Sequence, residues 1–316
     1  MEKILVIKLG ALGDFVQSMG AFEAIRNHHK QAEMTLMTTL PFETMAKDCG
    51  YFDKVWIDQR RPFYDIRSLL RVRRFFKYNH FNRVYDLQCV SRTNKYFNYL
   101  IPSPKPQWSG LAQGCSHPHT DVNRPELHTY NRHRQQLKLA GIGKVPDPHL
   151  DWVKADVSKF KLPDNYVLLI PGAAPGGESK KWPAEKYGEL AKFLVQHDYT
   201  PVVLGTQTEQ GVVKTIQSIC AETIDLAGKT DLYDIVGVAR HAKAAVGNDT
   251  GPTHIVAQSH CPITVLFSSH SDPNLFGPAG AHVQTLQRDN LNELTAEEVW
   301  AVSLRQLRGE RQVAMG

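Results

Sequence analysis

The fold class of this chain is decided by KILVIKLGALGDFVQSMGAFEAIR, residues 3–26. Residues 3–9 form an apolar run of the length of one buried strand, and the glycines of GALGD end that run. The next segment returns to apolar side chains at helical spacing, at Phe15, Met19, Phe22 and Ile25. The pattern therefore predicts a strand, a glycine-rich turn and a helix.

The same order recurs through the first half of the chain. We expect further strands at residues 33–39, 54–58 and 83–88, and helices at 41–48 and 68–77. Strands that alternate with helices are typical of a parallel sheet covered by helices on both faces. Residues 102–149 are rich in Pro, Gly, Gln and His, which predicts long loops there and one helix at 127–140.

The alternation starts again after residues 146–163, a segment with three prolines that we expect to be a linker. Strands are predicted at 165–170, 200–205, 223–228, 244–248 and 263–267, and helices at 182–198, 209–220, 231–241 and 252–259. Thr295 and Glu298 have the spacing of a capping box, which predicts a last helix with a basic end at Arg305, Arg308 and Arg311. The chain of 316 residues is long enough for two domains, which we place at 1–155 and 156–316.

The composition is that of a soluble globular protein, with 42% hydrophobic and 22% charged residues. No apolar run approaches the roughly 18 residues of a membrane span, and Lys8 interrupts the first run too early for a signal peptide. Five scattered cysteines without a C-x-x-C pair favour reduced thiols over a disulfide framework or a zinc ribbon. We therefore expect a cytoplasmic protein.

The net charge is modest, but it is unevenly distributed. Lys and Arg exceed Asp and Glu by 37 to 32, a difference of +5. Residues 60–83 contain eight Lys or Arg and only Asp65 as an acid, a local charge of +7. Such a run is usually a solvated helix face, but its interleaved aromatic residues also suit an anionic glycolipid or a membrane surface. No motif for nucleic acid accompanies it.

Three loops follow predicted strands, where ligands of open parallel sheets bind. The first, residues 10–14, is not G-x-G-x-x-G, so a nicotinamide fingerprint is absent. It ends in Asp14, whose plainer interpretation is a helix N-cap.

The second loop, PGAAPGGESKKW at residues 171–182, combines glycines, two lysines and a following helix. Backbone amides, the helix dipole and Lys180 or Lys181 together would suit a diphosphate. Gly172 and Gly177 have Walker A spacing, but Glu178 and Ser179 follow them, so the segment is not a P-loop. A solvated turn is the alternative.

The third loop, VGNDTGPTH at residues 246–254, places Asn248, Asp249, Thr250 and the Gly251 amide at a predicted helix start. This polar set suits phosphate and sugar hydroxyls, although a simple helix cap would use some of the same groups. An aspartic peptidase would need two D-T-G triplets on an all-β scaffold. Cys115, His117 and His119 do not have a zinc-site spacing, so we expect an ordinary loop there.

Four segments, in this order, resemble the heptosyltransferases of glycosyltransferase family nine: KILVIKLGALGDFVQSMGAFEAIR, VYDLQCVSR, PGAAPGGESKKWPAEKYGELA and VGNDTGPTHIVAQ. The resemblance implies an α/β fold of the GT-B type. In this fold two Rossmann-like, doubly wound parallel-sheet domains face a central cleft, and the last helix crosses back to the first domain. The activity implied is inverting, metal-independent transfer of heptose from ADP-heptose to the inner core of lipopolysaccharide, without a cofactor.

The resemblance also implies roles for single residues. Asp14 matches the base that deprotonates the acceptor hydroxyl, and Lys180 matches the lysine that holds the donor diphosphate. The residues expected to bind the donor are Gly13, Gly172, Lys181, Glu209, Asn248, Asp249, Thr250, Gly251 and His254. The residues expected to bind the acceptor are Arg60, Arg61 and Arg92. No metal ligands are expected.

Two other functions fit the same loops. One is a glycosyltransferase of the same fold with another nucleotide sugar, such as a UDP-hexose. The other is a non-catalytic protein that binds a sugar nucleotide or a glycolipid. The partners we expect are a nucleotide-sugar donor and an anionic glycolipid acceptor, with peripheral contact to the inner membrane surface and no nucleic acid.

Overall fold

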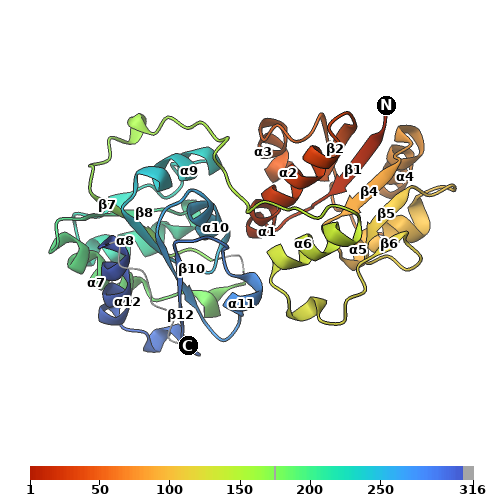
Figure 1. The fold of residues 1–316 in the computed structure, drawn as a ribbon. Coiled ribbons are helices and arrows are strands. Elements are labelled where there is room, and N and C mark those ends of the chain that lie inside the picture. The colour runs from red at the N-terminus through yellow and green to blue at the C-terminus, as the bar shows by residue number, and fades with distance from the viewer. Residues whose placement is uncertain (174–175, 309–316) are drawn as a thin grey trace. The chain divides into compact units, whose positions relative to one another are not determined.

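A computed structural model describes residues 1–173 and 176–308. The chain divides into two compact units, Met1–His149 and the part from Leu150 onward (Figure 1). The division lies a few residues before the boundary placed at residue 155 from the sequence. Each unit is built on one parallel sheet, as the alternation of strands and helices predicted.

The first unit contains a six-stranded sheet in the order β3-β2-β1-β4-β5-β6. Its strands are β1 (Lys3–Ile7), β2 (Glu33–Thr38), β3 (Lys54–Ile57), β4 (Arg83–Asp86), β5 (Gln107–Gly110) and β6 (His117–Pro118). Its helices are α1 (Leu12–Gln17), α2 (Met19–His28), α3 (Glu43–Asp48), α4 (Ile66–Asn79), α5 (Ser91–Lys95) and α6 (Thr129–Leu139). This strand order is that of a Rossmann fold.

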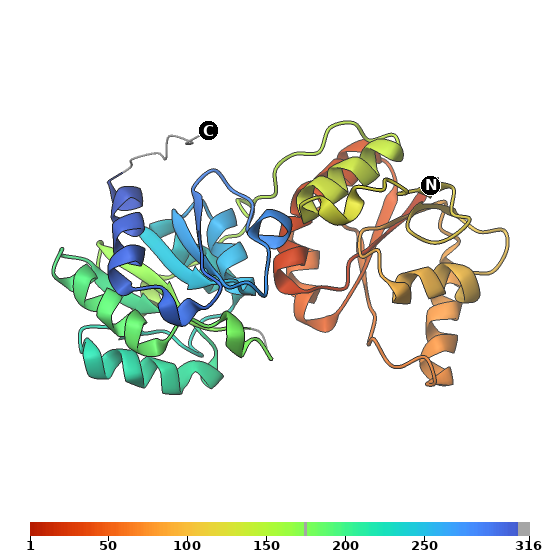
Figure 2. The same cartoon turned by 90° about the horizontal axis from the view of Figure 1, so that it is seen from below.

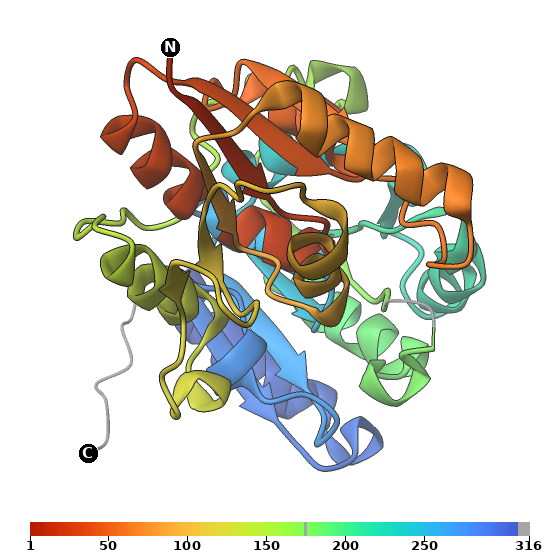
Figure 3. The same cartoon turned by 90° about the vertical axis from the view of Figure 1, so that its right-hand side faces the viewer.

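Both faces of the first sheet are buried, as a parallel sheet requires. Leu5 and Ile7 of β1 belong to one core cluster with Val72, Phe75 and Phe76 of α4, which lies along that face (Figure 3). The alternate β1 side chains, Ile4 and Val6, are equally buried. Because successive side chains of a strand point to opposite faces, β1 packs against two helical layers.

The helix predicted from Phe15 onward is two helices. The four apolar positions at helical spacing are all fully buried, as predicted. However, α1 ends at Gln17 and α2 begins at Met19, with Ser18 between them. The Ser18 hydroxyl donates a 2.7 Å hydrogen bond to the Asp14 carbonyl, one turn earlier. A serine that bonds to the backbone four residues before it tends to bend a helix.

The prediction of long loops over residues 102–149 was only partly right. The helix expected at 127–140 is α6, but the preceding stretch also contains β5 and β6. A helix of π type, Tyr96–Leu100, precedes them. β5 and β6 are short, and β6 includes Pro118, so no alternating apolar pattern marked them in the sequence.

The second unit repeats the topology of the first. Its sheet has the order β12-β11-β10-β7-β8-β9, again with all strands parallel. The strands are β7 (Tyr166–Ile170), β8 (Thr200–Val203), β9 (Ile224–Asp225), β10 (Ala244–Asn248), β11 (Ile263–Phe267) and β12 (Val283–Gln287). The helices are α7 (Ala184–Val195), α8 (Gln210–Ile219), α9 (Leu232–His241), α10 (Gly251–Gln258), α11 (Pro273–Phe276) and α12 (Ala296–Leu307). Of these, the sequence had not indicated α11 or β12, and the side chains of β12 are only partly buried or exposed.

Short 3₁₀ helices connect several of these elements. They are Leu40–Phe42, Arg124–Glu126, Ser158–Phe160, Glu178–Lys180, Gln207–Glu209 and Leu291–Glu293.

The last helix begins as predicted. Thr295 is its N-cap and forms the predicted capping box with Glu298, and Arg305 lies in its last turn. α12 packs against α7, β10 and β11 of the second unit (Figure 2). Its Trp300 side chain joins the core of that unit. The expected crossing back to the first domain stays a prediction. Arg311 lies outside the described residues.

The expected linker, residues 146–163, is held by both of its flanking units. A Cβ on Gly20 of α2 would lie 2.1 Å from the Pro146 carbonyl oxygen, so the backbones approach closely there. Arg240 of α9 donates hydrogen bonds of 2.6 and 2.7 Å to the carbonyls of Val153 and Leu150. The segment is thus attached to the protein surface along its length, which its prolines alone did not predict.

Two consequences follow for function. In each sheet the order of strands reverses direction at one point, between β1 and β4 and between β7 and β10. Ligands of open parallel sheets bind beyond the carboxyl ends of the strands at that point. Separately, no helix within residues 1–173 and 176–308 has both the length and the hydropathy needed to cross a membrane.

Candidate active site

In the second unit the polar loops converge at the carboxyl ends of β7 and β10. The chain after β7 carries Gly172 and Lys180, and the chain after β10 carries Asp249 and Thr250. Because β7 and β10 are hydrogen-bonded neighbours, their following loops lie next to each other. The second and third predicted loops therefore form one site.

Asn248, the last residue of β10, holds these two loops together. Its side-chain nitrogen donates to the carbonyls of Pro171 (2.8 Å) and Gly172 (3.4 Å). Its side-chain oxygen accepts from the Trp182 backbone N–H and the Tyr187 hydroxyl, both at 3.1 Å. All of these groups are internal, and Asn248 is completely buried. The Asn248 amide therefore fastens the two loops to each other, and its expected contact with the donor stays a prediction.

Lys180 and Asp249 form the charged centre of the site. The Lys180 ammonium lies 3.0 Å from Asp249 Oδ2, and His254 Nε2 lies 4.0 Å from Asp249 Oδ1. The Lys180 side chain keeps 30% of its surface exposed, against 11% for Asp249. A partly exposed lysine that a largely buried carboxylate holds in place is well placed to meet an anion.

The start of α10 lies beside this pair. Thr250 is the N-cap, and its backbone N–H donates to the Thr253 hydroxyl at 3.3 Å. Gly251 is the first helical residue. Of the two residues that the sequence offered as helix caps, Thr250 is therefore the N-cap of α10, whereas the Asp249 carboxylate forms an ion pair with Lys180. A helix start and a lysine together attract negative charge.

Glu209 lies after β8, beside the same loop. It accepts hydrogen bonds from the Thr206 N–H and hydroxyl at 2.7 Å and from the Thr208 hydroxyl at 3.0 Å. Burial alone would raise the pKa of Glu209, but these bonds, aided by the charge of Lys181, hold it below its usual value. A Cβ on Gly172 would lie 3.3 Å from the Glu209 carboxyl carbon, so glycine permits this approach. Lys181 itself pairs with Glu178 at 2.7 Å.

Asp14 belongs to the first unit, at the carboxyl end of β1. It lies in the first turn of α1 together with the buried Gly13. The N-cap of this helix is Ala11, and no side chain caps the helix by a hydrogen bond. The plainer interpretation of Asp14 as an N-cap was therefore wrong. Asp14 remains partly exposed; burial lowers the pKa values of Lys8 and Arg132, and the charge of Asp14 offsets part of that lowering. Gly13 is thus the one predicted donor residue outside the second unit.

A buried polar cluster, Lys8, Asp86, His133 and Gln136, lies at the reversal point of the first sheet. Burial lowers the pKa of Lys8 and lowers that of His133 well below its usual range. Burial also raises the pKa of Asp86 to about 6, against an ordinary 3.8. The Gln136 side chain donates to the Asp86 carbonyl at 2.9 Å. This cluster was not predicted from the sequence, although Lys8 inside an apolar run was a signal of it.

The predicted acceptor residues differ in their surroundings. Arg92 is largely buried: its guanidinium lies 3.4 Å from the Asp58 carboxylate and donates to the Arg61 carbonyl at 3.0 Å. It also donates to the Tyr96 hydroxyl, which in turn bonds to Asp58. Arg60 and Arg61 are exposed. Arg92 therefore holds the segment that carries Arg61, and its expected contact with the acceptor stays a prediction.

Cys115, His117 and His119 do not form a metal site. Cys115 bonds to the Gly110 carbonyl, His117 to Arg83 and His119 to Gln135. Among the described residues no group of three or more His, Cys, Asp or Glu side chains could hold a metal ion.

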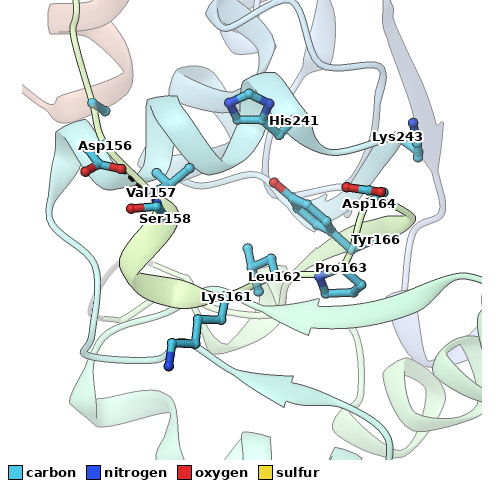
Figure 4. A pocket seen from close by; sticks show the side chains of 11 residues that line it. Asp156, Val157, Ser158, Lys161, Leu162, Pro163, Asp164, Tyr166, His241 and Lys243 are labelled. Carbon is cyan, nitrogen blue, oxygen red and sulfur yellow. Dashed lines mark hydrogen bonds between the residues drawn. The ribbon is translucent and has the colours of Figure 1, made fainter.

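A hollow of 770 Å³ lies at the amino edge of the second sheet, at the start of β7. Its lining comes from residues 155–164, Tyr166 and the end of α9 (Figure 4). The Tyr166 hydroxyl already donates to the Val238 carbonyl at 2.6 Å. None of the predicted site residues lines this hollow, and it lies at the edge opposite to the strand ends where ligands of such sheets bind.

We predict that Asn248→Ala lowers the free energy of unfolding by about 1–3 kcal/mol, because the buried Trp182 N–H and Pro171 carbonyl lose their partner. Urea denaturation measures this loss. Asn292→Ala, at an exposed position, is the matched control and is expected to change little. Equal stability of the two variants would contradict the role assigned to Asn248.

We predict a pH-dependent effect of Asp86→Asn. The folded protein binds a proton at Asp86 up to about pH 6, whereas the unfolded chain releases it near pH 3.8. The wild type therefore loses stability relative to the variant as the pH rises from 4 to 6, by up to about 3 kcal/mol. Urea denaturation of both proteins at several pH values measures this difference. A difference that stays constant with pH would contradict the raised pKa.

Comparison with known proteins agrees with this geometry. Residues 128–299, more than half of the chain, match the family model of glycosyltransferase family 9 (heptosyltransferase). Lipopolysaccharide heptosyltransferase 1 of Campylobacter coli is 24% identical over 305 residues, covering 87% of this chain and 86% of that protein. Lipopolysaccharide heptosyltransferase 2 of Escherichia coli K12 is 32% identical over 147 residues, 40% of each chain.

Solved structures show the same fold. The glycosyltransferase family 9 protein of Veillonella parvula superposes with a TM-score of 0.83 at 20% identity, covering 98% of both chains. The E. coli ADP-heptose lipopolysaccharide heptosyltransferase II superposes with a TM-score of 0.77 at 19% identity, covering 98% of this chain and 99% of that one. The predicted GT-B fold class of two Rossmann-like units is thereby confirmed. With the family model covering most of the second unit and its polar loops, this chain belongs to glycosyltransferase family 9, the heptosyltransferases.

Proposed function

We propose that this enzyme transfers heptose from ADP-heptose to the inner core of lipopolysaccharide, with inversion and without a metal ion. The observation that carries the proposal is the Lys180–Asp249 pair beside the start of α10. The relatives support the choice of sugar and acceptor, since both of those described above are lipopolysaccharide heptosyltransferases.

The second unit would bind the donor. Lys180 and the amide of Gly251 are suited to the diphosphate, because a lysine and a helix start both favour negative charge. Thr250 and His254 border the same position, and Glu209 is suited to the ribose hydroxyls as a hydrogen-bond acceptor. Asn248 contributes by fixing the loop that carries Lys180.

The leaving group explains why no metal is needed in this proposal. Departure of ADP leaves negative charge on the phosphate oxygens, and preformed donors aimed at such charge strongly lower a reaction barrier. Lys180 can supply a charge to these oxygens that a divalent ion supplies in other transferases. Asp249 keeps its ammonium in place before the reaction begins.

The first unit would activate the acceptor through Asp14. A sugar hydroxyl is a weak nucleophile until a positioned base removes its proton. The Asp14 carboxylate is partly exposed and does not cap its helix, so it is available for this task. Direct attack on the anomeric carbon, opposite to the leaving diphosphate, inverts its configuration. Arg60 and Arg61, both exposed, are suited to the acidic groups of the acceptor.

We predict that Asp14→Asn lowers kcat by about a hundredfold or more, because the general base is lost while the shape is kept. The affinity for ADP, measured by calorimetry, is expected to remain within about twofold. Release of ADP in the presence of acceptor measures turnover. Full activity in the variant would remove Asp14 from the role of base.

We predict that Lys180→Ala weakens ADP binding by about ten- to a hundredfold, the value of a hydrogen bond between charged groups. Lys192→Ala, an exposed position on α7, is the matched control. Calorimetry with ADP compares both variants with the wild type. If the two variants bind ADP equally well, the diphosphate is held elsewhere.

A panel of donors tests the proposed reaction as a whole. ADP-heptose is expected to raise the melting temperature and to release ADP only when acceptor is added. A shift with UDP-hexoses but not with ADP-heptose would indicate a different donor. Binding without release of ADP in the presence of acceptor would indicate a non-catalytic protein.

A further inference from the structure

The outward face of α4 combines positive charge with exposed apolar side chains. Arg67, Arg71, Arg73, Arg74 and Lys77 are all exposed on this helix. Between them lie Ile66 and Leu70, which are 69% and 45% exposed, and Tyr78, which is 69% exposed. Tyr64, just before the helix, is 85% exposed. We call these nine residues the α4 face.

The charge of the α4 face is not neutralised within the described part of the chain. None of its five cations forms an ion pair with a described acidic side chain. Asp65, the nearest acid in the sequence, caps the helix by accepting a hydrogen bond from the Ser68 N–H at 3.1 Å. Two of the cations lie over aromatic rings instead, Arg71 over Trp56 at 4.8 Å and Lys77 over Tyr78 at 5.8 Å.

A groove of 520 Å³ adjoins the α4 face, between α4 and the edge strand β3. Trp56 and Phe75, stacked with ring centres 4.3 Å apart, form part of its wall. Arg71, Arg74 and Tyr78 line the same groove. The groove therefore has an aromatic wall and a cationic rim.

The inner face of α4 is already used by the protein core. Val72, Phe75 and Phe76 are buried against the first sheet. The helix therefore cannot turn its main apolar face to a bilayer, and any partner meets only the outward side chains. Cations attract an anionic surface over a distance of about a Debye length, and exposed apolar and tyrosine side chains enter the boundary between head groups and acyl chains.

We propose that the α4 face and its groove dock this protein on an anionic lipid bilayer. From the sequence, residues 60–83 could be either a solvated helix face or a membrane-binding surface. The exposed Ile66 and Leu70, which lie among cations without acidic partners in the described residues, favour the membrane-binding surface. A solvated helix face gains nothing from these apolar side chains, and neither does a nucleic acid. The inference concerns a surface outside the proposed catalytic residues, and it does not rest on the proposed donor or acceptor.

The test is co-sedimentation of the full-length protein with vesicles that contain no glycolipid. Vesicles of 70% phosphatidylcholine and 30% phosphatidylglycerol are compared with vesicles of phosphatidylcholine alone. We expect binding to the anionic vesicles, weakened by salt, and little binding to the neutral ones. Arg67→Glu/Arg74→Glu is expected to reduce binding at least about twentyfold, since each cation contributes about fivefold.

Lys192→Glu/Lys214→Glu is the matched control, with the same change of charge on α7 and α8 of the second unit. It is expected to bind vesicles within about threefold of the wild type. Thermal unfolding and ADP affinity of both double variants report whether they are folded. Equal loss of binding in the two variants would show that only net charge matters, and it would overturn the proposal.

The apolar contribution is tested separately. Ile66→Ser/Leu70→Ser is expected to weaken binding to anionic vesicles about tenfold while the salt dependence remains. Brominated lipids are expected to quench the protein fluorescence, and Trp56→Phe is expected to remove most of that quenching, because Trp56 lines the groove. Unchanged binding of the serine variant, unchanged quenching in Trp56→Phe, or stronger binding to RNA than to vesicles would overturn the proposal. Heptosyl transfer is not a readout here, so failure of this inference and of the proposed function are distinguishable.

Discussion

The order in which parallel strands are added to a sheet is the constraint on which the rest of this structure depends. In both units the first strand of the sheet is also a central strand, with neighbours added to one side and then to the other. At the reversal, the loops after the two adjacent strands leave toward opposite faces of the sheet, and a crevice opens between them at the carboxyl ends of the strands. The polar groups of both loops border this crevice. Asp14 and Lys8 lie at this place in the first unit, and Lys180 and Asp249 lie at it in the second.

The two units support these positions with different buried chemistry. In the second unit, Asn248 is neutral and fully hydrogen-bonded, so it can be buried at little cost and holds two loops rigidly. In the first unit, Lys8 and Asp86 are ionisable. Burial lowers the pKa of Lys8 and raises that of Asp86, and each shift favours the neutral form of the side chain. Rigid loops suit the binding of a diphosphate, whereas buried ionisable groups link the stability of the first unit to pH.

The secondary structure was largely readable because its signals are local. The spacing of Phe15, Met19, Phe22 and Ile25, and the capping box at Thr295, depend on residues within one or two turns of each other. β5, β6 and β12 were missed because they are short or only partly buried, and their strand conformation comes from pairing with a neighbour distant in sequence. The break at Ser18 was missed because a serine inside an apolar pattern does not show which backbone group it bonds.

The sequence by itself determined that the chain has two doubly wound sheets, and it determined which loops bear the polar residues of the site. It could not determine which of those residues face solvent, because burial and hydrogen bonding depend on partners far away along the chain. Tertiary structure decided that Asn248 is a clamp, that Arg92 is occupied by Asp58, and that Lys180 is held by Asp249, 69 positions later. It also left the cations of α4 without acidic partners among the described residues. The residue type determines which bonds a side chain can form, but its role depends on which groups the fold brings within about 3 Å of it.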